Sequence, residues 1–124
     1  MKLKLKEVLT ISTVLKTIID DTSSRIDPLL KFKLLGLLKA TEGHVENFQE
    51  VRNEKINEYG ETDEDGNIFI PKENQEAIKQ FNDALGALVD SEVTVTADKL
   101  KAGDIFNKGI PAQYLIALYP LIEE

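Results

Sequence analysis

The sequence predicts a single α+β domain over residues 1–124, mainly helical and organised around one long helix. The stretch 28–59 contains no proline after its first residue and only two glycines, which predicts an uninterrupted helix. Three short segments rich in alternating or β-branched residues, at 2–6, 67–70 and 92–96, predict a small sheet of open strand order. The content of 42% hydrophobic and 30% charged residues is typical of a globular protein.

The N-terminal region predicts a strand followed by a short helix. Residues 2–6 alternate lysine and leucine, as in a strand with one buried face. From Ser12 to Asp20 apolar residues recur at spacings of three and four, which predicts a helix with Ser12 as its N-cap. The polar residues 21–24 predict a turn before the next helix.

The long helix has signals at both ends. Asp27 is a suitable N-cap, Pro28 suits the first helical position, and Gly60 is a suitable terminator. At the rise of an α-helix, its length would be roughly 48 Å, so we expect it to project from a domain of this size. Its first half is apolar on nearly all sides, which predicts enclosure by several neighbours. Its second half carries a narrow apolar stripe, which predicts packing on one side only, as one arm of a helical hairpin.

The other arm of the hairpin follows an acidic turn. Residues 63–67 predict the turn, and residues 67–70 predict a short strand. Pro71 then predicts the start of a helix that runs through Asp90. This helix is about half as long as the long helix, and we expect it to return antiparallel beside it.

The C-terminal third predicts smaller elements. Residues 92–96 alternate with β-branched side chains and predict a strand, and residues 99–109 predict a loop. A final short helix is predicted from Ile110 to Leu118, with Pro120 ending it.

The charge balance is acidic, with 22 acidic and 15 basic side chains and a net charge of -7. Coating of bare nucleic acid needs an excess of lysine and arginine, so we expect no direct nucleic-acid partner. No apolar run reaches the roughly 18 residues of a membrane span, and residues 1–15 lack the pattern of a signal peptide. With no cysteine in the chain, we expect a cytoplasmic protein without a membrane partner, and a virus particle assembled in the cytoplasm is equally compatible.

Signatures of catalysis and of metal binding are missing from the sequence. His44 is the one histidine, so a two-histidine zinc motif cannot form, and no glycine-rich phosphate motif or nucleophile elbow occurs. Asp63 and Asp65 match ligand positions of a calcium loop, but Glu61 stands at position one, where aspartate is needed, and Lys72 stands where the closing bidentate glutamate is needed. We therefore expect no enzymatic activity, no cofactor and no metal, a hairpin turn at the acidic segment, and an exposed or half-packed His44.

The strongest non-random feature is a row of glutamates in the long helix. Its members recur every four residues and are Glu42, Glu46, Glu50, Glu54 and Glu58, which we call the glutamate row. At this spacing they share one helix face and repel one another by about 0.2–0.5 kcal/mol a pair. Lys55 can reach Glu58, whereas Arg52 has no glutamate three or four residues away. Two interpretations stay open, a solvated face that keeps the hairpin soluble or a docking face for a basic partner.

Charge is also segregated along the chain. Residues 1–39 carry eight basic and four acidic side chains, whereas residues 40–124 carry seven basic and 18 acidic ones. A particle with one basic end and one acidic arm can associate head to tail, which produces rings or stacks rather than two-fold dimers. We therefore expect a homo-oligomer whose mass depends on salt concentration.

Two segments carry a resemblance to a known group of proteins. The segment from Tyr59 to Pro71, YGETDEDGNIFIP, and that from Ile110 to Leu118, IPAQYLIAL, resemble short acidic uncharacterised proteins encoded by tailed phages and prophages of Gram-positive bacteria. In those proteins a long helix ends in a YG-x-x-DEDGN turn. A strand, a Pro-started helix, an EV-x-V strand and a Pro-started C-terminal helix before IEE follow. The same order over roughly residues 28–124 implies a phage origin in the host cytoplasm or the virion, and the resemblance transfers no catalytic residue.

These observations lead to two hypotheses of function. The first is a non-enzymatic phage protein that acts through protein–protein contacts, with itself or with another phage or host protein, as a structural or assembly accessory. The alternative is an acidic inhibitor that blocks a basic nucleic-acid-binding surface of a host defence protein. Besides the glutamate row, Tyr114 and Tyr119 are candidate partner contacts, because aromatic residues anchor interfaces. Ordinary packing of the terminal helix is the other interpretation of these two tyrosines.

Overall fold

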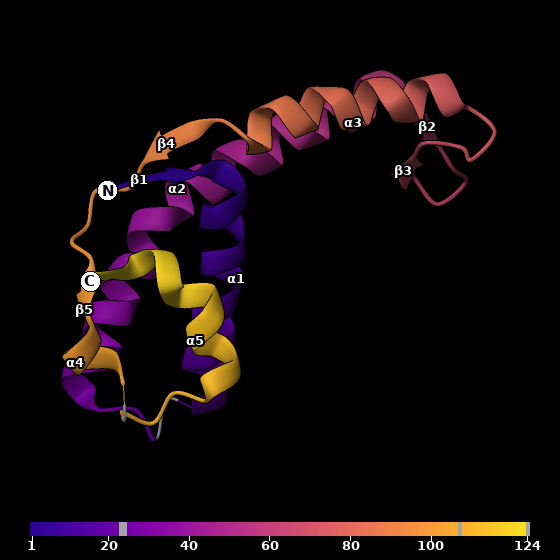
Figure 1. Cartoon of the computed structure of the whole chain (residues 1–124). Coiled ribbons are helices and arrows are strands. Elements are labelled where there is room, and N and C mark those ends of the chain that lie inside the picture. The colour runs from indigo at the N-terminus through magenta and orange to yellow at the C-terminus, as the bar shows by residue number, and fades with distance from the viewer. Residues whose placement is uncertain (23–24, 107, 124) are drawn as a thin grey trace.

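The computed structural model describes residues 1–22, 25–106 and 108–123, and it confirms the mainly helical α+β class (Figure 1). The helices are α1 (Leu5–Thr22), α2 (Pro28–Tyr59), α3 (Gln75–Val89), α4 (Ala102–Ile105) and α5 (Ala112–Leu118), and a 3₁₀ turn, η1 (Tyr119–Leu121), follows them. The strands are β1 (Lys2–Lys4), β2 (Glu61–Thr62), β3 (Ile68–Phe69), β4 (Glu92–Thr94), β5 (Leu100–Lys101) and β6 (Ile122–Glu123).

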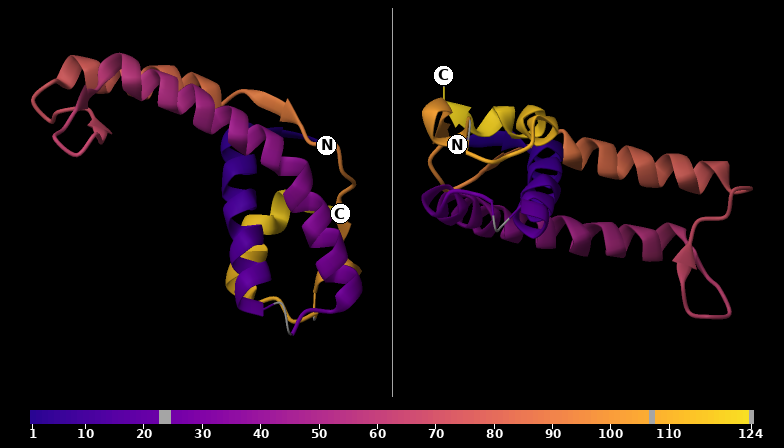
Figure 2. Two further views of the ribbon diagram at one scale, coloured as in Figure 1. Left: turned by 180° about the vertical axis from the view of Figure 1, so that it is seen from behind. Right: turned by 90° about the horizontal axis from the view of Figure 1, so that it is seen from below.

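The molecule consists of a helical body and a long projecting arm. In the body, α1 packs along the first half of α2, and α5 packs against α1 (Figure 1, Figure 2). The second half of α2 extends beyond the body with α3 antiparallel beside it, and the β2–β3 hairpin closes the far end. The predicted helical hairpin is therefore confirmed, and we call residues 42–91 the arm.

The predicted single sheet of three segments is wrong in one part: the segments 2–6 and 92–96 do pair, but the segment 67–70 pairs elsewhere. β1 pairs antiparallel with β4, placing Leu3 opposite Val93, while β3 pairs with β2 at the tip of the arm. A third pair, β5 with β6, is parallel and joins segments of the body. Each pair is two strands wide, so helix packing rather than sheet pairing supplies the core.

The N-terminal helix begins earlier than its predicted start. β1 ends at Lys4 and α1 begins at Leu5, so Ser12 lies buried inside the helix and is not an N-cap. The start is stabilised instead by Glu7, whose Oε1 accepts a hydrogen bond of 3.0 Å from the Lys4 amide, as in one half of a capping box. Of the predicted turn at 21–24, Asp21 and Thr22 are helical, and residues 23–24 lie outside the described residues.

Both predicted ends of α2 are confirmed. The Asp27 carboxylate accepts a hydrogen bond of 3.3 Å from the Leu30 amide, and Pro28 occupies the first helical position. The helix runs unbroken through Gly43 and ends at Tyr59, where the Gly60 amide donates to the Ile56 carbonyl at 2.7 Å.

The predicted enclosure of the first half of α2 is wrong. One side is buried in the core through Leu30, Leu34 and Leu37. The opposite side carries exposed apolar side chains, because α1 covers α2 from one direction only. These are Leu29, Phe32 and Leu35, with 61%, 76% and 43% of their surfaces exposed, and we call them the outer strip.

In the arm, α3 begins later than predicted. The Pro71 carbonyl accepts a hydrogen bond from the Asn74 amide and forms a turn, and the helix starts only at Gln75. Asn74 is the N-cap, because its side chain accepts a hydrogen bond of 3.1 Å from the Ala77 amide.

Two short elements occupy the segment predicted as a loop, residues 99–109. β5 and the single turn α4 lie there, and both are held by contacts with distant parts of the chain. The last predicted helix is confirmed as α5, although it begins at Ala112, two residues later than predicted. It ends at Leu118 as predicted, but Pro120 lies inside η1, which follows the helix directly.

The main core lies in the body, and Ala77 of α3 is buried separately, in the arm. The side chains of the main core come from β1, α1, the segment before α2, the first half of α2 and the C-terminal third. They are Leu3, Val8, Ile11, Leu15, Ile18, Ile26, Leu30, Leu34, Leu37, Val95, Leu100, Ile105, Leu118 and Leu121. Within the described ranges, no helix is long and apolar enough to cross a membrane.

An ion pair joins the body to the base of the arm. The Lys6 ammonium of α1 lies 2.9 Å from the carboxylate of Asp90, the C-cap of α3. This hydrogen bond, reinforced by the opposite charge, lowers the pKa of Asp90 and raises that of Lys6. The Asp90 contribution to stability is therefore present above its ordinary pKa of 3.8 and is lost as the pH falls through the lowered value.

Replacing Lys6 by glutamine is expected to return the pKa of Asp90 toward 3.8. A carboxyl-carbon NMR titration of both proteins measures this shift. Lys16, which is exposed on the same helix, provides the control, since Lys16→Gln should leave the Asp90 titration unchanged. An Asp90 pKa that does not respond to Lys6→Gln would show that the ion pair does not form in solution.

Candidate functional site

The glutamate row lies along the arm, and all five of its side chains are exposed. Successive members are four residues apart, or about 6 Å along the helix axis. Half-buried apolar side chains of this helical segment, among them Val45, Phe48 and Val51, form the stripe that packs within the arm. The five glutamates lie on the part of the helix surface that this stripe leaves uncovered, so their side chains remain in solvent.

The row is almost uncompensated by positive charge. Lys55 pairs with Glu58 at 3.0 Å, as predicted, and this bond raises the pKa of Lys55. In the part of the chain that the structure describes, the other four glutamates form no ion pair. The arm thus presents a line of negative charge that a cationic surface can neutralise.

His44 makes a structural contact. It is half-buried, as predicted, and its Nε2 lies 2.8 Å from the Thr94 carbonyl oxygen. A carbonyl oxygen only accepts, so Nε2 carries the hydrogen in this contact, which ties α2 to the end of β4. Across residues 1–22, 25–106 and 108–123, no three His, Asp or Glu side chains are grouped so as to hold a metal ion.

The acidic turn between β2 and β3 is closed by one of its own carboxylates. Asp63 Oδ1 accepts hydrogen bonds from the amides of Asp65 at 2.9 Å and Asn67 at 2.8 Å. Gly66 has a φ of 85°, which the turn requires and which glycine adopts without strain. The predicted hairpin turn is confirmed, and the Asp63 carboxylate stabilises it by accepting these two hydrogen bonds.

The two candidate tyrosines differ in their surroundings. The Tyr114 hydroxyl donates to an Asp21 carboxylate oxygen at 3.2 Å, and its half-buried ring packs against the core. Tyr119 is 63% exposed in η1. Both lie on the body, far from the glutamate row on the arm (Figure 1), so the two groups of predicted contacts do not form one site.

The outer strip is the surface that sequence reasoning missed. Its members follow one another at a spacing of three, while the buried Leu30, Leu34 and Leu37 follow the opposite side of α2. The spacing of three was visible in the sequence. When a helix is apolar on two opposite sides, however, its sequence does not tell whether both sides are buried or one of them is exposed.

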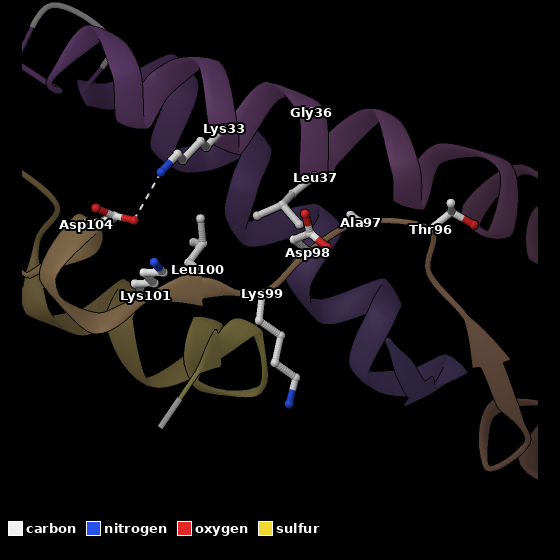
Figure 3. A pocket seen from close by; sticks show the side chains of 10 residues that line it. All are labelled: Lys33, Gly36, Leu37, Thr96, Ala97, Asp98, Lys99, Leu100, Lys101 and Asp104. Atoms are coloured by element: carbon white, nitrogen blue, oxygen red, sulfur yellow. Dashed lines mark hydrogen bonds and ion pairs between the residues drawn. The ribbon is translucent and has the colours of Figure 1, made fainter.

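A cavity of about 500 Å³ lies between α2 and the segment 96–104 (Figure 3). Lys33 and Asp104 form an ion pair of 3.0 Å across it. Asp98 and Leu37 both line this cavity, whereas the Lys99 side chain extends away from α2 (Figure 3). The cavity therefore holds charges of both signs beside an ion pair that fastens α4 to α2.

No family model matches the sequence, and neither a curated protein nor a solved structure shows significant similarity to it. The charge and the apolar exposure of its own surfaces are the observations that bear on its function.

Proposed function

We propose that this chain is a non-enzymatic protein of a tailed phage that acts through protein–protein contacts, as a structural or assembly accessory. The resemblance of the Tyr59–Pro71 and Ile110–Leu118 segments supports the phage origin. The observation that carries the role in protein contact is the glutamate row, exposed over its whole length on an arm that projects from the body.

The independence of the arm from the core supports this role. In the sequence, Leu37 and Val95 are consecutive members of the main core, and no residue of the arm belongs to it. The body therefore forms its core without the arm. An arm that is not needed for burial and that carries uncompensated like charge is suited to contact another molecule. Complementary charge would come from a partner whose surface is rich in lysine and arginine.

The same row also supports the alternative, an acidic inhibitor that occupies a basic nucleic-acid-binding surface of a host protein. A line of carboxylates competes with phosphates for the same cations, and such binding weakens steeply with salt. The two functions differ in the bound protein: an accessory co-purifies with particle components, whereas an inhibitor captures a host protein and displaces its nucleic acid.

The test is a charge reversal within the row. Glu46→Lys, Glu50→Lys and Glu54→Lys together are expected to weaken capture of the partner from infected cells by about tenfold or more, because like charges placed together at an interface cost several kcal/mol. The three residues are exposed, so circular dichroism should report an unchanged helix content.

A matched control places the same change of charge elsewhere on the arm. Glu73, Glu76 and Asp83 are exposed in and before α3, and their replacement by lysine should leave capture largely intact. Unchanged capture by the row variant would contradict the proposal. Equal loss from both variants would assign binding to the total charge of the arm and would also remove the row as a docking face.

A further inference from the structure

The outer strip is bordered by lysines. Lys31 lies four residues before Leu35 and Lys39 four residues after it, so both share its side of the helix. In the described part of the chain neither of these lysines forms an ion pair. Lys108 lines a small cavity together with Leu29, but Asp27 and Asp104 line it too, so the charge at this end of the strip is mixed.

The tip of the arm has the opposite charge around a second apolar patch. Ile68 and Phe69 of β3 are 39% and 44% exposed. The same hairpin carries four exposed carboxylates, those of Glu61, Asp63, Glu64 and Asp65. The sequence has no basic residue from Gly60 to Pro71, so nothing within the hairpin offsets this charge. We call residues 61–69 the acidic tip.

The two patches lie at opposite ends of the molecule. The outer strip is on the first turns of α2, and the acidic tip follows its last residue (Figure 1, Figure 2). The helix between Phe32 and Tyr59 is continuous, which separates the patches by about 40 Å. The tip of one molecule therefore cannot cover the strip of the same molecule.

We propose that copies of this chain bind one another head to tail, with the acidic tip of one copy covering the outer strip of the next. The charges indicate which surface covers the outer strip. If two strips met, Lys31 and Lys39 of one copy would face the same lysines of the other copy. If two tips met, carboxylates would face carboxylates. Of these three pairings, only tip against strip joins apolar to apolar surface and also places opposite charges at the rim. The segregation of charge between residues 1–39 and 40–124 favours the same orientation.

A contact between two different patches is heterologous. Each bound copy leaves one free strip and one free tip, so assembly continues into a ring or an open filament. This inference deepens the proposed function by naming a second copy as a partner, and it uses the tip and the strip rather than the glutamate row.

Two variants that each lose one patch test this arrangement. Phe32→Asp removes the apolar centre of the strip and adds a charge that repels the acidic tip. Phe69→Asp removes the apolar contact of the tip and puts a charged group where an apolar surface would be buried, which costs free energy unless that group is paired. By analytical ultracentrifugation the wild-type mass is expected to rise with protein concentration and to fall with added salt. Each variant alone is expected to self-associate at least about tenfold more weakly.

The decisive measurement is a mixture of the two variants. The Phe69→Asp protein keeps an intact strip and the Phe32→Asp protein keeps an intact tip, so their mixture should form a 1:1 complex that cannot grow. Ile116→Asp, an equally polar change at an apolar residue of α5 that is 80% exposed, should assemble like the wild type. Circular dichroism checks that each variant keeps its helix content.

A charge exchange gives an independent result if Phe69→Asp disturbs the hairpin. Lys31→Glu with Lys39→Glu should abolish self-association, and so should Glu64→Lys with Asp65→Lys. The four changes in one chain should restore it, because tip and strip are again opposite in charge.

Three results would overturn the inference. The first is a monomer at every protein and salt concentration. The second is normal self-association of the Phe69→Asp variant, which would indicate strip-to-strip pairing. The third is a monomeric chain that binds phosphatidylglycerol vesicles through Phe32, which would make the strip a membrane-surface contact. A monomeric chain that still captures another protein through the glutamate row would leave the proposed function intact.

Discussion

Replacing Leu34 by alanine is expected to lower the free energy of unfolding by about 2–5 kcal/mol. Leu34 has 0% of its surface exposed and lies in the core that α2 shares with α1. The smaller side chain loses apolar burial and leaves a cavity that the surrounding helices fill only in part. Urea unfolding followed by circular dichroism measures the change as a shift of the midpoint at constant slope.

The neighbouring leucine is the matched control. Leu35 is 43% exposed on the outer strip, so Leu35→Ala should change the free energy of unfolding by less than about 1 kcal/mol. Both proteins should be compared at high salt and low concentration, because association through the strip would add apparent stability to the wild type. Similar losses at the two positions would mean that the outer strip is covered within the molecule.

Replacing Gly109 by alanine is expected to destabilise the body by about 2 kcal/mol or more, because two penalties coincide. Gly109 has a φ of 94°, in the left-handed region that disfavours side chains. A Cβ atom there would also lie 2.5 Å from the carbonyl oxygen of Arg25, which is much closer than a van der Waals contact. The segment before α5 would have to move away from the start of α2.

A comparison with Gly66 separates the conformational penalty from the steric penalty. Its φ of 85° is similar, but an added Cβ would meet no atom within 4 Å. Gly66→Ala should therefore carry the conformational cost alone, about 1 kcal/mol, and should act on the tip of the arm. Thermal unfolding of both variants provides the comparison. A Gly109→Ala protein as stable as the Gly66→Ala protein would show that the close approach to Arg25 is absent in solution.

Substitutions on the exposed arm can test partner binding and self-association separately from folding. The body closes its own core, so substitutions on the glutamate row or the acidic tip should affect binding while leaving the stability of the body unchanged. Binding through the row and association through the tip can therefore be altered one at a time, and an effect on either is separable from unfolding.

The ends of the long helix could be predicted from the sequence, because the signals there act within one turn. The Asp27 carboxylate reaches an amide three residues on, Pro28 needs no amide partner at the first position, and the Gly60 amide bonds to Ile56. The acidic turn is equally local, since Asp63 and Gly66 close it by themselves. The exposure of the glutamate row could also be predicted from the sequence, because burying an unpaired carboxylate costs a large amount of free energy.

Only the tertiary structure decided which strands pair and which apolar face is covered. A two-residue strand has no periodicity, so β5 and β6 exist because packing of the body brings them together. Ser12 looks like a cap in sequence, but α1 begins at Leu5, so Ser12 lies inside the helix and has no cap role. Leu34 and Leu35 are chemically identical, and their different fates depend on α1, which covers one side of α2 and leaves the other in water.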